Sequence, residues 1–107
     1  MRISFDVVIH DLDGEPVIDD TNPDQKKPLQ LGVIARNALL ASYQDEQGLS
    51  GDDKFQRFNL ACRTKGEVDW TAEDIALLKK LIAKAYGPLI VGRAFEALER
   101  RGAVKAV

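Results

Sequence analysis

The first residues of the chain alternate between apolar and polar side chains. Positions 3, 5, 7 and 9 are all apolar, and most of the residues between them are polar. A period of two is typical of a half-buried β-strand. Asp13-Gly14 then indicates a hairpin turn of type I′, which needs positive φ at both central residues. Val17 and Ile18 suit a return strand at a sheet edge, because Pro16 cannot donate to a ladder. The pattern therefore predicts a β-hairpin over residues 3–18.

After residue 30 the apolar positions follow helical spacing instead. They predict four helices, which run from Leu31 to about Tyr43, from Ser50 to Gly66, from Thr71 to Tyr86, and from Pro88 to Gly102. Ser50 and Thr71 are favoured N-caps, and acidic residues follow each of them where the helix dipole favours negative charge. Pro88 suits the first position of a helix. No strand is predicted after the hairpin.

The apolar stripes of these helices identify the expected core. In the first helix the stripe follows Leu31 and Ile34, and Leu39 and Leu40 widen it. In the second helix the face to be buried holds Phe55, Phe58, Ala61 and Cys62. Cys62 is the single cysteine, so no intramolecular disulfide can form, and we expect a buried structural thiol in a reducing compartment.

The length of 107 residues suits one domain. Residues 19–28 are the most polar stretch and predict a mobile loop between the hairpin and the helical part, residues 31–102. The expected fold class is α+β, an N-terminal β-hairpin packed on a bundle of about four α-helices. A hairpin of two strands is not stable alone, so it must pack on the helices.

Composition excludes several classes of protein. A formal charge of -2, 45% hydrophobic residues and 30% charged residues exclude a disordered tail, a membrane protein and a strongly basic nucleic-acid carrier. No apolar run reaches the roughly 20 residues that cross a bilayer. Asp6 interrupts any apolar region of a signal peptide. We therefore expect a cytoplasmic protein without membrane contact.

Residues 11–14, Asp-Leu-Asp-Gly after an apolar strand, resemble the start of haloacid dehalogenase phosphotransferases. In that family the first Asp, here Asp11, is the nucleophile, and the second, here Asp13, is the general acid beside Mg²⁺. Glu15 stands where the family usually has Thr, and the parallel sheet of that family needs further strands.

The acidic residues at positions 11–15 also lack the EF-hand spacing for Ca²⁺. His10 has no nucleophile nearby, and there is no zinc cluster or glycine-rich phosphate loop. We therefore expect no catalytic residue, metal site or cofactor.

The candidate partner-binding residues are Trp70, Tyr43, Arg93 and Arg100. Trp70 precedes the third helix, where an apolar residue often packs against the fourth helical position, here Ile75. Trp is also enriched in interface hot spots, so Trp70 is either a hydrophobic staple that packs against the helix or an exposed anchor that binds a partner. The same choice between packing and partner binding applies to Tyr43. The two arginines lie on the last helix among acidic residues. An alternative function is therefore a small nucleic-acid-binding regulator that uses this helix.

Four segments together resemble small proteins encoded by tailed bacteriophages and prophages. They are residues 11–16, 31–41, 54–58 and 85–94. The resemblance implies a bacterial host cytoplasm and work done by contact with other proteins, and it assigns no site residue. We expect a non-enzymatic phage protein that binds a host factor, a component of the phage particle or its assembly, or another copy of itself.

Overall fold

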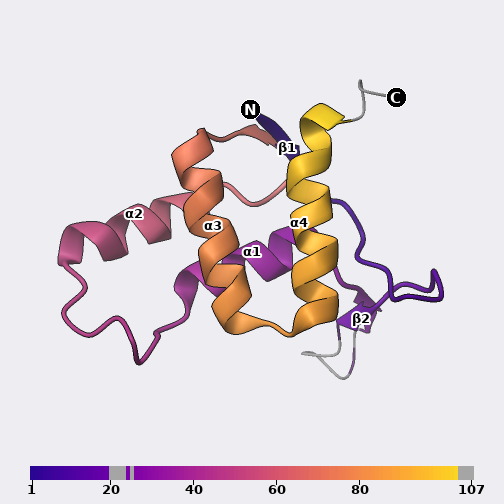
Figure 1. Ribbon diagram of the computed structural model, residues 1–107, viewed down its shortest axis with the longest axis horizontal. Helices are drawn as coiled ribbons and strands as arrows, with labels where there is room; N and C mark the ends of the chain where they lie inside the picture. The colour runs from indigo at the N-terminus through magenta and orange to yellow at the C-terminus, as the bar shows by residue number, and fades with distance from the viewer. Residues whose placement is uncertain (20–23, 25, 104–107) are drawn as a thin grey trace.

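The computed structural model describes residues 1–19, 24 and 26–103, with side chains up to Glu99. Its elements, in chain order, are β1 (Arg2–Ser4), β2 (Ile18–Asp19), β3 (Lys27–Pro28), α1 (Leu31–Leu40), α2 (Gly51–Ala61), β4 (Glu67–Asp69), α3 (Ala72–Ala85) and α4 (Pro88–Ala103). Antiparallel strand pairs lie beside four helices (Figure 1), which confirms the α+β class. None of the helices in the described part has the length and apolar content to span a bilayer.

The strands pair with partners that the sequence did not predict. β1 pairs with β4, so that Ile3 lies opposite Val68, and β2 pairs with β3. The prediction of no strand after the hairpin is therefore wrong. β3 and β4 are only two and three residues long, too short to show a period of two. β3 also falls in the segment predicted as a mobile loop, of which residues 20–23 and 25 lie outside the described residues.

Residues 9–17 fold back on themselves, as the hairpin prediction requires. The amide of Val17 donates a hydrogen bond to the carbonyl of Ile9 at 2.9 Å, and His10 forms a bridge with Pro16. The prediction of a type I′ turn is wrong, because Gly14 has a φ of 86° and no non-glycine residue in the described ranges has positive φ. Only one residue of the turn needs the left-handed region that glycine favours.

The helix starts follow their local signals. The hydroxyls of Ser50 and Thr71 each accept a hydrogen bond from the amide three residues later, at 3.0 and 3.1 Å. These are the predicted N-caps. α4 begins at Pro88, as predicted. Capping is local chemistry, so it can be read from neighbouring residues alone.

Two helix ends come earlier than predicted. α1 ends at Leu40 rather than near Tyr43, whose hydroxyl donates a hydrogen bond to the Ala38 carbonyl at 2.7 Å. α2 ends at Ala61, and Gly66, with a φ of 67°, lies beyond it rather than at its C-cap. The segment after α1 and the segment after α2 both line the surface between these two helices.

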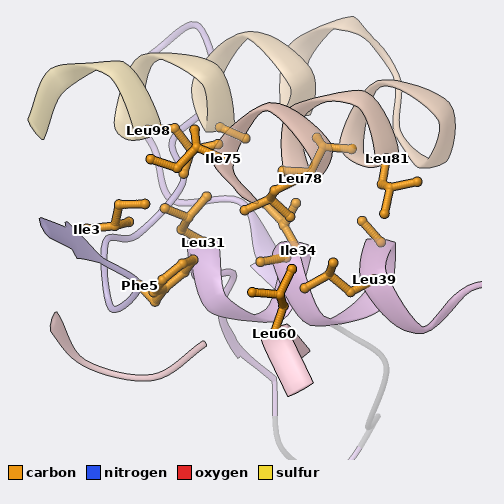
Figure 2. Close-up of a cluster of buried hydrophobic side chains, with 14 of the residues drawn as sticks. Ile3, Phe5, Leu31, Ile34, Leu39, Leu60, Ile75, Leu78, Leu81 and Leu98 are labelled. Atoms are coloured by element: carbon orange, nitrogen blue, oxygen red, sulfur yellow. The ribbon is translucent and has the colours of Figure 1, made fainter. Parts of the chain in front are cut away.

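The core lies where α1 crosses the pair formed by α3 and α4 (Figures 1 and 2). Buried side chains from all three helices meet there, with Ile3 and Phe5 from the N-terminal segment and Leu60 from α2. Trp70 is 1% exposed, and its ring lies 5.2 Å from the ring of Phe5. Ile75, Leu78 and Ile82 recur at helical spacing along α3 and are buried, whereas Ala85 at its end is exposed.

Other backbone segments pack closely against Gly32, in the first turn of α1. A Cβ there would lie 2.2 Å from the carbonyl oxygen of Thr64, which follows α2, and 3.1 Å from that of Phe5. The amides of Leu31 and Gly32 donate to the carbonyls of Val7 and Phe5 at 2.9 and 2.8 Å. The start of α1 therefore holds both the segment after β1 and the segment after α2.

Candidate protein-binding groove between α1 and α2

α2 projects from one side of the molecule, at the left of Figure 1, and packs mainly against α1. Phe58 on α2 is 53% exposed, and Leu40 at the end of α1 is 56% exposed. The Phe58 ring stacks on that of Phe55, which is also exposed, with 6.4 Å between the ring centroids. Large apolar side chains that are exposed together are typical of an interaction surface.

Two hollows lie beside Leu40 and Phe58, and both residues line each of them. The first, of about 520 Å³, is formed with the loop after α1. The second, of about 500 Å³, lies over α1 and the end of α2, where Cys62 is part of the lining. We call Leu40, Phe58 and the two hollows the α1–α2 groove.

The face of α2 that is buried differs from the predicted one. Phe58 and Cys62 are exposed, and the buried residues are Arg57, Leu60 and Ala61. The two stripes overlap only at Ala61, and each has helical spacing, so periodicity alone could not separate them. Leu40 was likewise expected to widen the buried stripe of α1 and is exposed instead.

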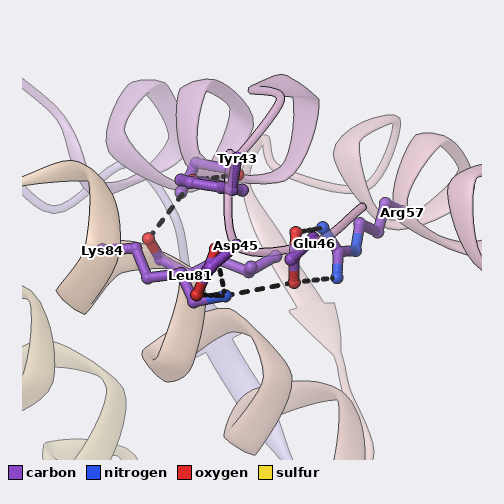
Figure 3. A network of polar contacts seen from close by, with 7 residues as sticks. Tyr43, Asp45, Glu46, Arg57, Leu81 and Lys84 are labelled. Atoms are coloured by element: carbon purple, nitrogen blue, oxygen red, sulfur yellow. Dashed lines mark hydrogen bonds and ion pairs between the residues drawn. The ribbon is translucent and has the colours of Figure 1, made fainter. Parts of the chain in front are cut away.

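An ion-pair network explains how an arginine can be buried in α2 (Figure 3). The guanidinium of Arg57 donates hydrogen bonds to both oxygens of Glu46, at 2.6 and 2.8 Å, and the two side chains are only 9% and 11% exposed. The Nζ of Lys84 on α3 lies 3.2 Å from Glu46 and 3.1 Å from Asp45. Tyr43 adds a hydrogen bond to the Leu81 carbonyl at 3.3 Å.

These contacts shift the pKa values of the groups. The hydrogen bonds from Arg57 hold the pKa of Glu46 at about 2, against the opposing effect of burial, and Lys84 lowers it further. The same pair raises the pKa of Arg57, while the hydrogen bond to Asp45 raises the pKa of Lys84. Burial raises the pKa of Tyr43. At neutral pH Glu46, Arg57 and Lys84 are therefore all charged, and they hold the loop that lines the first hollow between α2 and α3.

The accessible charge of the groove is positive. Arg36, Lys54 and Lys65 line the hollows, and Arg36 donates a hydrogen bond to the Thr64 hydroxyl at 3.3 Å. Lys54 and Lys65 are exposed and form no ion pair with any residue that the structure describes. The remaining charged lining residues, Glu46 and Arg57, neutralise each other. The groove therefore combines the exposed apolar side chains of Leu40 and Phe58 with a cationic rim, the side chains of Arg36, Lys54 and Lys65.

The residues predicted to bind a partner do not form one site. Trp70 is buried, and its ring nitrogen donates to the Arg63 carbonyl at 3.2 Å, so the exposed-anchor interpretation is wrong. Tyr43 is half-buried and lines the groove. Arg93 on α4 lies elsewhere and binds backbone carbonyls of the turn at residues 9–17. Arg100 belongs to α4, and its side chain lies outside the described part.

The carboxylate of Asp11 in that turn binds the backbone. The Asp11 carboxylate accepts hydrogen bonds from the amides of Asp13 and Glu15 at 2.9 and 3.0 Å. Within the described ranges, no group of three His, Cys, Asp or Glu side chains could hold a metal ion. The pairing of the strands is antiparallel, unlike the parallel sheet of haloacid dehalogenases.

Comparisons with known proteins give no relative. No family matches the chain, and no curated protein or solved structure matches it. The resemblance to phage proteins therefore stays a prediction. The function has to be argued from the surface itself.

Proposed function

We propose that this protein acts without catalysis, by binding another protein at the α1–α2 groove. The observation that carries the proposal is the joint exposure of Leu40 and Phe58 where two hollows meet. Exposed single apolar residues are common, but large ones that line adjacent hollows are typical of binding surfaces.

The chemistry of the groove indicates the kind of segment it receives. Leu40 and Phe58 favour an apolar side chain of the partner, and Arg36, Lys54 and Lys65 favour carboxylates beside it. Burying a large apolar side chain contributes about 1.5–3 kcal/mol, whereas an exposed ion pair contributes about 0–1 kcal/mol. The apolar contacts therefore supply most of the affinity, and the cations orient the partner and exclude basic segments.

The groove is built before the partner arrives. The Glu46–Arg57 pair and Lys84 hold the loop after α1 in place, and the close approach at Gly32 holds the segment after α2. A preformed site loses little conformational entropy on binding. This supports a specific interaction through a short segment of the partner.

The setting of this interaction is part of the same proposal. The resemblance of residues 11–16, 31–41, 54–58 and 85–94 to phage proteins supports a phage origin and a bacterial host cytoplasm. The partner is then a host factor, a component of the phage particle or its assembly, or a second copy of this chain. No observation favours the alternative of a nucleic-acid regulator, because Arg93 is engaged by the His10 and Asp11 carbonyls and by Glu96.

Selection of displayed random peptides on the immobilised protein tests the proposal. We expect enriched peptides that share an apolar residue flanked by Asp or Glu. The same selection on Phe58→Ser protein is the matched control and should lose this consensus. Enrichment of the same peptides on both proteins, or of peptides without acidic and apolar residues, would contradict the proposal.

A further inference from the structure

The turn at residues 11–15 has the chemistry that the α1–α2 groove favours. Leu12 is 84% exposed, more than any other exposed large apolar side chain among the described residues. Asp13 and Glu15 beside it are exposed, and their carboxylates form no ion pair within the part of the chain that the structure describes. We call residues 11–15 the acidic turn.

The acidic turn is held rigidly although it is exposed. The Asp11 carboxylate accepts the amides of Asp13 and Glu15, and the Asp11 amide donates to the Glu15 carbonyl at 2.8 Å. Arg93 fixes the base of the turn to α4, because it donates to the carbonyls of His10 and Asp11, each at 3.0 Å. A rigid turn presents Leu12 with little entropy left to lose on binding.

The turn cannot reach the groove of its own chain. In Figure 1 the indigo turn projects from the side of the molecule opposite to α2. The two surfaces are therefore available to other molecules at the same time. They differ from each other, so a contact between them is heterologous and can repeat from one copy to the next.

We infer that the acidic turn of one copy binds the α1–α2 groove of a second copy. Leu12 would then contact Leu40 and Phe58, and the carboxylates of Asp13 and Glu15 would face the cationic rim. The inference rests on the proposed function, and it identifies the partner as the protein itself. A single turn in a groove makes a small interface, so the association is weak and becomes visible only at high concentration.

Sedimentation velocity over a range of about 10 μM to 1 mM tests the inference. It is done with a reductant that prevents disulfides through Cys62. We expect the average mass of the native protein to rise with concentration past that of a dimer. Leu12→Ser should weaken the association at least about tenfold. Circular dichroism should show that Leu12→Ser protein is folded, because Leu12 is exposed.

Mixing two variants distinguishes this arrangement from a symmetric dimer. The Leu12→Ser protein keeps an intact groove but lacks the apolar side chain of the acidic turn. The Phe58→Ser protein keeps an intact acidic turn but lacks an apolar side chain of the groove. Each should stay monomeric alone, and an equimolar mixture should form a one-to-one complex and nothing larger. A symmetric contact through Phe58 would show no such complementation.

Exchanging charges tests the orientation of the contact. Glu15→Lys and Lys65→Glu should each weaken association, and combining them in one chain should restore part of it. A native protein that stays monomeric throughout, or a Leu12→Ser protein that associates like the native one, overturns the inference. If peptides still bind the groove in that case, the proposed function stands, and only the identity of the partner is wrong.

Discussion

Arg57 on α2 and Glu46 in the loop after α1 form a bidentate ion pair at 2.6 and 2.8 Å, and both side chains are almost completely buried. The pair joins two segments that are eleven residues apart and together line the first hollow of the α1–α2 groove. Removing Glu46 leaves the buried guanidinium of Arg57 without its counterion, which is strongly unfavourable. The shape of the groove therefore depends on a titratable carboxylate.

Stability should fall in acid because of this carboxylate. The pKa of Glu46 is lowered from 4.5 to about 2, so the unfolded chain binds its proton more tightly than the folded protein does. The contribution is therefore complete above about pH 4.5 and is lost as the pH falls from 4.5 towards 2. Urea unfolding across this range measures it. Glu46→Gln should flatten the dependence, and an unchanged slope would show that the pair does not control acid stability.

Gly32→Ala should destabilise the protein by about 1–3 kcal/mol. The added Cβ would meet the Thr64 carbonyl oxygen at 2.2 Å, and backbone cannot rotate away as a side chain can. Gly92→Ala is the matched control, since nothing lies within 4 Å of a Cβ in the middle of α4. It should stabilise the protein by about 0.5–1 kcal/mol. Equal effects of the two changes in thermal unfolding would contradict the close approach.

Truncation of two nearby apolar residues of α2 should destabilise the protein to very different degrees. Leu60 is buried, so Leu60→Ala should reduce the free energy of unfolding by about 2–5 kcal/mol. Phe58 has more than half of its surface in water, so Phe58→Ser should reduce it by no more than about 1 kcal/mol. Denaturant unfolding of both variants makes the comparison. A larger loss at Phe58 would indicate that it belongs to the core rather than to a binding surface.

Ile82 tests the position of α3 in the core. It is fully buried, and Ile82→Ala should reduce the free energy of unfolding by about 2–5 kcal/mol through the cavity it leaves. Chemical denaturation of the variant and of the native protein gives this difference. A change below about 1 kcal/mol would mean that α3 is misplaced.

Local chemistry could be predicted from the sequence, and contacts between distant segments could not. Thr71 and Ser50 were identified as N-caps because a cap depends on residues a few positions away. The pairing of β1 with β4 joins residues more than sixty positions apart in two strands of three residues, which leave no periodic pattern.

The groove was missed for a related reason. Phe58 and Leu60 both lie on apolar stripes of α2, and only the partner of Arg57 decides which stripe is buried. That partner, Glu46, lies in a loop without regular spacing. One indication was Leu39-Leu40 at the end of α1, because adjacent side chains point about 100° apart around a helix, so the second leucine can leave the core.

The most direct test of the groove is the alkylation rate of Cys62, which lines its second hollow. The rate is measured with an acidic and apolar peptide from the selection, and with a control peptide in which Lys replaces each Asp and Glu. We predict that the first peptide slows alkylation of the native protein and that the control does not, and that Phe58→Ser abolishes the protection. An unchanged rate with a peptide that demonstrably binds would place the binding surface elsewhere and contradict the account.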